Sequence, residues 1–313
     1  MKIVFELPFY SPNSGGITES IKFAQKLGAH IRFQRRSDYG IPIAMNYSVG
    51  MPDKTFPQCD VCVTYSDNPY TDDLCRLPQV GKVFVYFMSY GMEINRERRN
   101  AMHPKTTNLC TTKKVESALN SEGINVQRIG FAIDMAEMYD NKKRRKSVLS
   151  LYYHPSPLKR YNLSLDVAHK LYSLGFIDNT ISFGTQDQYN SFKKPVNLIH
   201  HYSNASKEQV NKLFNESKIF VNTSASEGLS RTPIEATLCG CPSVICDGAI
   251  GEIFFDGENC FVAKKDDLFD ITNQAIELLA NIETYRKRFR NNMLEVTKDY
   301  TWDNLIKKFK EAL

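Results

Sequence analysis

The sequence predicts an α/β protein built from two doubly wound parallel sheets. Three observations carry this prediction: apolar strand-like runs alternate with helical patterns, a strand–glycine loop–helix unit opens the chain, and the alternation restarts near residue 146. The length of 313 residues suits one large domain or two smaller ones. With 42% apolar and 24% charged residues the chain has a globular composition, which excludes a disordered or collagen-like protein.

The first half opens with a predicted strand over 2–7, a loop that ends in Gly15-Gly16, and a helix. The apolar residues of that helix recur at helical spacing: Ile17, Ile21, Ala24 and Leu27. Further along, the pattern indicates strands over 61–65, 83–88 and 125–129 and a helix over 112–120. The polar run 141–147 then separates two apolar patterns. We therefore expect an N-terminal Rossmann-like domain over 1–145.

The second half repeats the alternation. Strands are predicted over 148–153, 180–183, 196–199, 219–222 and 243–246. Helices are predicted around Leu163–Leu174, after the capping box Ser206-x-x-Gln209, from Pro233 to near Gly240, and over 266–279. This half is the expected C-terminal domain, 146–295. A last helix begins at Trp302, and we expect the segment 296–313 to pack back on the N-terminal domain.

The net charge of +5 lies entirely in the first half, because residues 1–145 hold 20 basic and 15 acidic residues and the rest is balanced. Such asymmetry indicates an anionic partner. The longest clean apolar run, 83–88, is far short of the roughly 20 residues that a membrane-spanning helix needs. Pro8 interrupts any signal-peptide core. We therefore expect a cytoplasmic protein whose eight cysteines are reduced.

One pair of cysteines has the spacing of half a zinc knuckle, Cys59-x-x-Cys62. Valines alternate with Cys62 as they would on a strand, and no second close pair follows. We therefore expect no metal site.

The segment 224–242 is the most informative part of the chain. Glu227 and Glu235 bracket seven residues, and Glu235 lies about one turn into a predicted helix that follows a strand. Backbone amides at the start of a helix form an anion site, which suits a diphosphate. The two carboxylates can accept hydrogen bonds from sugar or ribose hydroxyls on either side of it.

This segment resembles the Glu-x7-Glu signature of family 4 glycosyltransferases, retaining enzymes with the GT-B fold. The residues that match are Glu227, Gly228, Glu235, Ala236, Gly240 and Pro242; Ser230 departs, since glycine is common there. The resemblance implies that Glu235 binds the nucleotide ribose and that Glu227 contacts the transferred sugar. It also implies that donor-binding residues lie between them: Gly228, Leu229, Ser230, Arg231 and Thr232.

Two further segments resemble the same family. In the loop after strand 148–153, Lys159 falls on the family's diphosphate-binding lysine, His154 falls where an arginine is usual, and Arg160 follows. A histidine there is a weaker, titratable cation. The Tyr-x-x-Pro form of this loop is similar to that of rhamnan-type transferases. Near the N-terminus, Gly15 and Gly16 occupy the loop that in the family approaches the donor phosphates and the acceptor.

The resemblance implies a glycosyltransferase that moves a hexose or deoxyhexose from a nucleotide diphosphate sugar, with Glu227, Lys159 and His154 as the catalytic residues and no metal or other cofactor. Two other uses of the fold stay open: an epimerase or phosphorylase, and a binding protein without turnover.

The acceptor is left open by the sequence. A glycan or lipid-linked glycan, reached at the inner membrane surface, suits the basic first half. Nucleic acid bases are the second choice, with these candidate phosphate contacts: Arg32, Arg35, Arg36, Arg96, Arg98 and Arg99.

Overall fold

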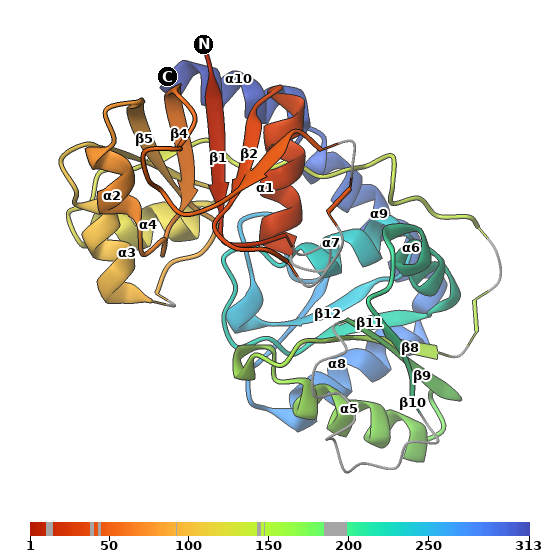
Figure 1. The fold of residues 1–313 in the computed structure, drawn as a ribbon. Coiled ribbons are helices and arrows are strands. Elements are labelled where there is room, and N and C mark those ends of the chain that lie inside the picture. The colour runs from red at the N-terminus through yellow and green to blue at the C-terminus, as the bar shows by residue number, and fades with distance from the viewer. Residues whose placement is uncertain are drawn as a thin grey trace. The chain divides into compact units, whose positions relative to one another are not determined.

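The computed structural model describes residues 1–10, 15–37, 41–42, 45–91, 93–142, 145–146, 148–184 and 199–313. Contacts divide the described chain into two compact units (Figure 1). The first unit comprises Met1–Ala132 together with Tyr300–Leu313, and the second comprises Ile133–Asp299. Each unit holds one parallel sheet with helices against it, which is the doubly wound architecture that the sequence predicts.

In the first unit the described residues form a seven-stranded sheet of order β3-β2-β1-β4-β5-β6-β7. The strands are β1 (Ile3–Leu7), β2 (His30–Phe33), β3 (Tyr47–Val49), β4 (Cys59–Tyr65), β5 (Val80–Phe87), β6 (Thr106–Cys110) and β7 (Gln127–Arg128). The helices are α1 (Gly15–Lys26), α2 (Thr71–Arg76), α3 (Ile94–Ala101), α4 (Lys113–Ser121) and α10 (Trp302–Ala312). The order reverses between β1 and β4, and open parallel sheets bind ligands beyond the carboxyl ends of the strands at such a switch point.

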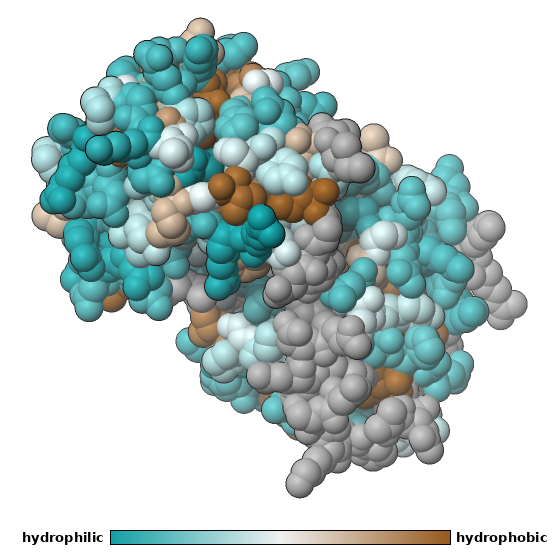
Figure 2. All heavy atoms as spheres, in the orientation of Figure 1, coloured by the Kyte–Doolittle hydropathy of each residue, from teal (hydrophilic) through white to brown (hydrophobic). Residues whose placement is uncertain are grey.

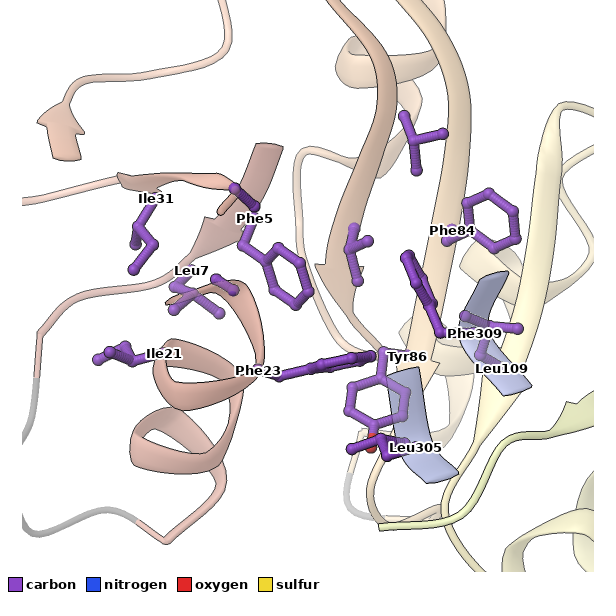
Figure 3. Packing of buried hydrophobic residues seen from close by; sticks show 14 of the residues in the cluster. Phe5, Leu7, Ile21, Phe23, Ile31, Phe84, Tyr86, Leu109, Leu305 and Phe309 are labelled. Atoms are coloured by element: carbon purple, nitrogen blue, oxygen red, sulfur yellow. The ribbon is translucent and has the colours of Figure 1, made fainter. Parts of the chain in front are cut away.

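The core of the first unit joins the two ends of the chain (Figure 3). Phe23 of α1 is fully buried, and its ring lies edge-on to Phe5 of β1 at 5.4 Å and to Phe309 of α10 at 5.2 Å. Trp302 and Leu305 of α10 are buried in the same cluster. The stripe on the last helix is therefore a core stripe of this unit.

In the second unit the described residues form a six-stranded sheet of order β10-β9-β8-β11-β12-β13. The strands are β8 (Val148–Tyr153), β9 (Asn179–Gly184), β10 (Ile199–Ser203), β11 (Ile219–Asn222), β12 (Ser243–Cys246) and β13 (Phe261–Ala263). The helices are α5 (Tyr161–Ser173), α6 (Lys207–Glu216), α7 (Arg231–Leu238), α8 (Leu268–Ala280) and α9 (Ile282–Thr297). In this sheet the switch point falls between β8 and β11.

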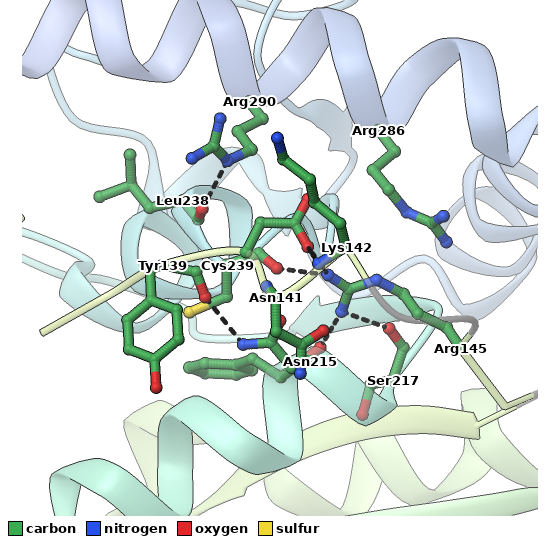
Figure 4. A network of polar contacts seen from close by, with 12 residues as sticks. Tyr139, Asn141, Lys142, Arg145, Asn215, Ser217, Leu238, Cys239, Arg286 and Arg290 are labelled. Atoms are coloured by element: carbon green, nitrogen blue, oxygen red, sulfur yellow. Dashed lines mark hydrogen bonds and ion pairs between the residues drawn. The ribbon is translucent and has the colours of Figure 1, made fainter.

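The first unit ends at Ala132, whereas the basic run in the sequence predicts a domain boundary at residue 145. The reason is that the segment after Ala132 is bound to the second unit. Asn211 of α6 donates to the carbonyl of Glu137, and the buried Arg145 side chain donates to the carbonyls of Ser217 and Cys239 (Figure 4). Part of the predicted linker, residues 143, 144 and 147, lies outside the described residues, as do residues 11–14 of the predicted N-terminal loop.

The strands β8, β11 and β12 have the predicted bounds, and most other predicted elements are present within one to three residues of their expected ends. The strand expected at 196–199 is described only from Ile199, where β10 begins, and runs on to Ser203. The sequence analysis missed β2, β3, β6, α2, α3 and α9. The helix α3 reads INRERRNA, so it shows no apolar stripe, and its placement comes from polar contacts described below.

Hydrophilic residues cover most of the described surface on the face drawn in Figure 2. No helix within the described ranges is long and apolar enough to cross a bilayer.

All eight cysteines are buried free thiols. Cys59, Cys62 and Cys75 pack with Val4 and Leu74 in one apolar cluster. Across the part of the chain that the structure describes, no three His, Cys, Asp or Glu side chains gather as a metal site would require. Cys59 and Cys62 both lie on β4 and belong to this apolar cluster.

Candidate functional site

The switch point of the second sheet brings together the two segments that the sequence analysis selects. The strand β8 leads into a short 3-10 turn, Pro157–Lys159, and then into α5, while the neighbouring β11 leads through residues 223–230 into α7. The carboxyl ends of adjacent parallel strands lie at the same sheet edge. Ala225 donates its amide to the carbonyl of Leu158 at 2.7 Å, and Thr223 donates its hydroxyl to the carbonyl of Arg160 at 3.0 Å.

Lys159 and Glu227 form an ion pair at this edge. The Lys159 Nζ lies 2.5 Å from Glu227 Oε1, and the side chains are 24% and 13% exposed. The partial burial makes this pair stronger than a surface pair, since less water screens the charges. The structure thus brings two of the predicted catalytic residues into direct contact.

Glu235 lies in the second turn of α7 and is 12% exposed. Its Oε1 accepts a hydrogen bond from Lys207 Nζ at 2.6 Å. The sequence analysis selected Glu235 but not Lys207, which is the first residue of α6. The only signal near it in the sequence was the Ser206-x-x-Gln209 capping box. That cap is present, because Ser206 Oγ accepts the amide of Gln209 at 3.2 Å.

Tyr152, at the end of β8, lies in the electrostatic reach of both glutamates. Burial, with smaller contributions from the charges of Glu227 and Glu235, raises the pKa of the Tyr152 hydroxyl to about 12. Lys159 Nζ stands 5.8 Å from the centre of the same ring. Both glutamates and the lysine therefore lie within electrostatic reach of one phenol.

His154 stacks on this group. Its ring lies 6.4 Å from the Tyr152 ring with 30° between the planes, and its Nδ1 accepts the amide of Ser156 at 3.1 Å. Because Nδ1 accepts, the proton of the neutral imidazole is on Nε2. The predicted residue thus lies in the same loop as Lys159, with its Nδ1 committed to the backbone.

The turn between the two glutamates is held by its own hydrogen bonds. Asn222 donates to the hydroxyl of Ser230 at 2.7 Å, and Asn222 accepts the amide of Ser224 at 2.9 Å. Ser230 precedes α7, whose first residues are Arg231 and Thr232. The first amides of a helix lack partners within the helix and carry partial positive charge. Gly228, Leu229 and Ser230 therefore lead the backbone into a helix start of the kind at which anions bind.

Cations gather at the starts of several helices of this unit. Arg160 has a left-handed backbone, φ 49°, directly before α5, and its side chain pairs with Asp266, which precedes α8. Lys207 is the first residue of α6 and Arg231 the first of α7. The helix dipole disfavours cations at these positions. The carboxyl edge of this sheet therefore combines the positive ends of helices with cationic side chains.

The two predicted glycines lie in the first unit. Gly15 and Gly16 are the first residues of α1, and a Cβ on Gly16 would lie 3.3 Å from Met88 Sδ. A cavity of about 420 Å³ lies beside them, at the switch point between β1 and β4. Its polar and aromatic lining includes Phe9, Ser20, Tyr65, Ser66, Asp67, Tyr86, Ser89 and Arg96.

A buried glutamate orders the loops around this cavity. Glu97 of α3, 1% exposed, accepts the hydroxyl of Ser66 at 3.1 Å and the amide of Gly91 at 2.8 Å. Asn100, one turn further along α3, donates to the carbonyl of Ser66 at 2.9 Å. The sequence analysis did not select Glu97, because a glutamate in a polar helix has the pattern of a solvent-exposed residue.

Comparison with known proteins gives three findings. Residues 182–281 match the family model described as Glycosyl transferases group 1. A 115-residue segment is 28% identical to the uncharacterized glycosyltransferase MJ1178 of Methanocaldococcus jannaschii, and covers 36% of this chain and 32% of that protein. The matched segment thus spans about a third of the relative.

Two solved structures are similar over nearly their full lengths. HepE of Anabaena in complex with UDP-glucose aligns with a TM-score of 0.81 at 13% identity, over 100% of this chain and 99% of that one. Sucrose-phosphate synthase of Thermosynechococcus elongatus aligns with a TM-score of 0.79 at 11% identity, over 100% and 98%. At such identities the likeness concerns the fold.

Proposed function

We propose that this chain, which has the GT-B fold and whose residues 182–281 belong to the glycosyl transferases group 1 family, transfers a sugar from a nucleotide diphosphate sugar with retention of the anomeric configuration. The observation that carries the proposal is the ion pair between Lys159 and Glu227 at the switch point of the second sheet. Lys159 is a cation that can stabilise a leaving diphosphate, and Glu227 is a carboxylate that can accept hydrogen bonds from sugar hydroxyls. Glu227 lies in the turn that leads into α7.

The donor would bind along this edge. Its diphosphate would face the first amides of α7, the cations Lys159 and Arg160 and the Nε2–H of His154, and its ribose hydroxyls would donate to Glu235. Glu227 would accept a hydrogen bond from a hydroxyl of the sugar. The resemblance also assigns Gly15 and Gly16, at the start of α1, to the binding of the donor phosphates.

In the reaction the bond between the anomeric carbon and the diphosphate oxygen breaks, and the acceptor oxygen forms the new bond to that carbon. Negative charge grows on the departing phosphate, and the cations and helix amides stabilise it. The acceptor proton passes to that phosphate on the same face of the sugar, so the configuration is retained. The protein's own cations supply the charge, so the proposal requires no divalent metal.

HepE, whose structure holds UDP-glucose, shares the fold, and this supports a UDP-hexose as the first donor to test. The charge excess within residues 1–145 supports an anionic acceptor: a glycan or a lipid-linked glycan, met at the membrane surface. The experiment is a donor-consumption assay with each acceptor class, followed by NMR of the product's anomeric proton.

The outcomes separate the alternatives. A product with retained configuration that needs an acceptor agrees with the proposal, and an inverted product contradicts it. Donor consumption without acceptor identifies an epimerase, and consumption that requires free phosphate identifies a phosphorylase. Donor binding with no turnover identifies a binding protein, and transfer to DNA in preference to glycans replaces the acceptor assignment.

A further inference from the structure

We propose that Lys207 positions Glu235 for the ribose of the donor, so that the two side chains together select ribonucleotide over 2′-deoxyribonucleotide donors. The inference rests on the proposed function. It excludes dTDP-sugars as preferred donors and points to UDP- or GDP-sugars. Three features of the second unit carry it: the position of Lys207 on its helix, the contact it makes, and the burial of its partner.

Lys207 occupies a position that does not favour a cation. It is the first residue of α6, where the helix dipole is positive and the Ser206 cap already satisfies the amide of Gln209. Acidic residues stabilise such positions, and lysines stabilise the opposite end of a helix. The electrostatics of α6 alone therefore do not account for the lysine.

The side chain of Lys207 reaches across to α7. Its Nζ lies 2.6 Å from Oε1 of Glu235, and the lysine is 48% exposed while the glutamate is 12% exposed. The lysine holds one of the two carboxylate oxygens. An ionised carboxylate has about four sites for donors, so sites remain for hydroxyl groups.

A largely buried carboxylate needs its hydrogen bonds satisfied. With Lys207 on one oxygen, the two vicinal hydroxyls of a ribose supply further donors, whereas a 2′-deoxyribose supplies one fewer. A site built to hydrogen-bond a hydroxyl discriminates strongly against the analogue that lacks it. Without Lys207 the carboxylate turns more freely and loses this preference.

The arrangement repeats the one at Glu227. Glu227, in the turn before α7, forms an ion pair with Lys159, and Glu235, in α7, forms one with Lys207. In each pair the lysine comes from another loop or helix. Lys159 lies in the loop that would face the diphosphate, and Lys207 lies at the ribose side of the proposed donor site. The first pair therefore serves the chemistry and the second serves recognition.

The test uses the full chain and its variants Lys207→Met, Lys207→Arg and, as a control, Lys212→Met, which changes an exposed lysine further along α6. Calorimetry measures the affinities for UDP, GDP and their 2′-deoxy counterparts. We expect the wild type to prefer the ribonucleotide by about tenfold or more. In Lys207→Met that ratio should fall toward one, with the loss confined to the ribonucleotide. Lys207→Arg should keep part of the ratio, and Lys212→Met all of it.

Two results would overturn the inference while leaving the proposed function intact: a wild type that binds ribonucleotide and deoxyribonucleotide equally, and a Lys207→Met variant that keeps its ratio or loses both affinities equally. A wild type that binds no nucleoside diphosphate would contradict the proposed function itself. A positioning role also predicts a raised KM for the donor with an almost unchanged kcat in Lys207→Met, which a structural role confined to folding would not produce.

Discussion

The carboxylate of Glu227 lies 2.5 Å from the ammonium nitrogen of Lys159, although 68 positions separate the two residues in the sequence. The contact joins the loops that follow β8 and β11, the adjacent strands between which the order of the second sheet reverses. The contact therefore brings together two segments that the sequence pattern marks independently, the loop that holds Lys159 and the turn that holds Glu227.

The first prediction concerns Glu227→Ala. The variant should lose transfer by at least about 100-fold, because the carboxylate is assigned to the transferred sugar rather than to the nucleotide. Nucleotide affinity should stay largely intact. The measurement is kcat for transfer together with the Kd for the free nucleotide, with the exposed Glu258→Ala as the control. Transfer that survives in Glu227→Ala would remove the residue from the catalytic group.

A second prediction compares two nearby glycines. A Cβ on Gly248 would lie 2.0 Å from the carbonyl oxygen of Ala225, two residues before Glu227, whereas a Cβ on Gly251 would meet Leu229 at an ordinary 3.8 Å. Gly248→Ala must therefore displace the turn that carries the site, at a cost of about 1–3 kcal/mol, and weaken donor binding. Gly251→Ala should change neither. Thermal unfolding and donor titration of both variants check this, and equal behaviour of the pair would contradict it.

The third prediction concerns the anchor of the segment after Ala132. Arg145 is buried, pairs with Asp140 at 3.1 Å and donates to the carbonyls of Ser217 and Cys239 (Figure 4). Arg145→Met removes the charged partner of the largely buried Asp140, which among the described residues keeps only the amide of Lys142 on Oδ1. It also takes the arginine donor from the two carbonyls, so it should lower the free energy of unfolding by about 3–5 kcal/mol. The exposed neighbour provides the control, since Lys146→Met should stay within about 0.5 kcal/mol. Denaturant unfolding gives both values, and similar stabilities would refute the anchoring role.

The fourth prediction concerns pH. Glu6 and Arg32 are both buried in the first unit, with Arg32 Nε 3.4 Å from Glu6 Oε2. Burial raises the pKa of the Glu6 carboxyl from 4.5 to about 8, although Arg32 and Gln34 act to lower it. Because the folded pKa is the higher one, the stabilising contribution of the protonated carboxyl is complete below pH 4.5, falls as pH rises, and is lost above about pH 8.

Glu6→Gln removes this titration. The difference in unfolding free energy between the wild type and Glu6→Gln should therefore decline from about pH 5 to about pH 8, by an amount on the order of a few kcal/mol. Urea unfolding at a series of pH values measures it. A difference that stays constant, or that grows with pH, would contradict the raised pKa.

The geometry of the candidate site could be predicted where its residues are close together in the sequence. Glu227, the turn after it and Glu235 lie within one strand–turn–helix unit, so their spacing along the chain already determines their places at a helix start. The sheets followed from the alternation of strands and helices, although short or polar elements such as β3 and α3 were missed. In those elements tertiary contacts outweigh the local pattern.

Lys207 and Glu97 could not be predicted, because each acts through a contact with a residue far along the chain. Lys207 meets Glu235 across 28 positions, and Glu97 meets Ser66 across 31. In the sequence the first is a lysine after a helix cap and the second a glutamate in a charged helix. Lys207 gains its partner from the packing of α6 beside α7, and Glu97 gains its partners from the loops that follow β4 and β5.

The most direct test of the account is a thermal-shift screen of UDP-, GDP-, dTDP- and CMP-sugars on the wild type and on Glu235→Ala. The account predicts that at least one diphosphate sugar stabilises the wild type by several degrees, about 1 kcal/mol or more for a chain of this size. The shift should be largely lost in Glu235→Ala, and the CMP-sugar, which lacks the diphosphate, should give none. The account is contradicted if no diphosphate sugar stabilises the wild type, or if Glu235→Ala responds as the wild type does.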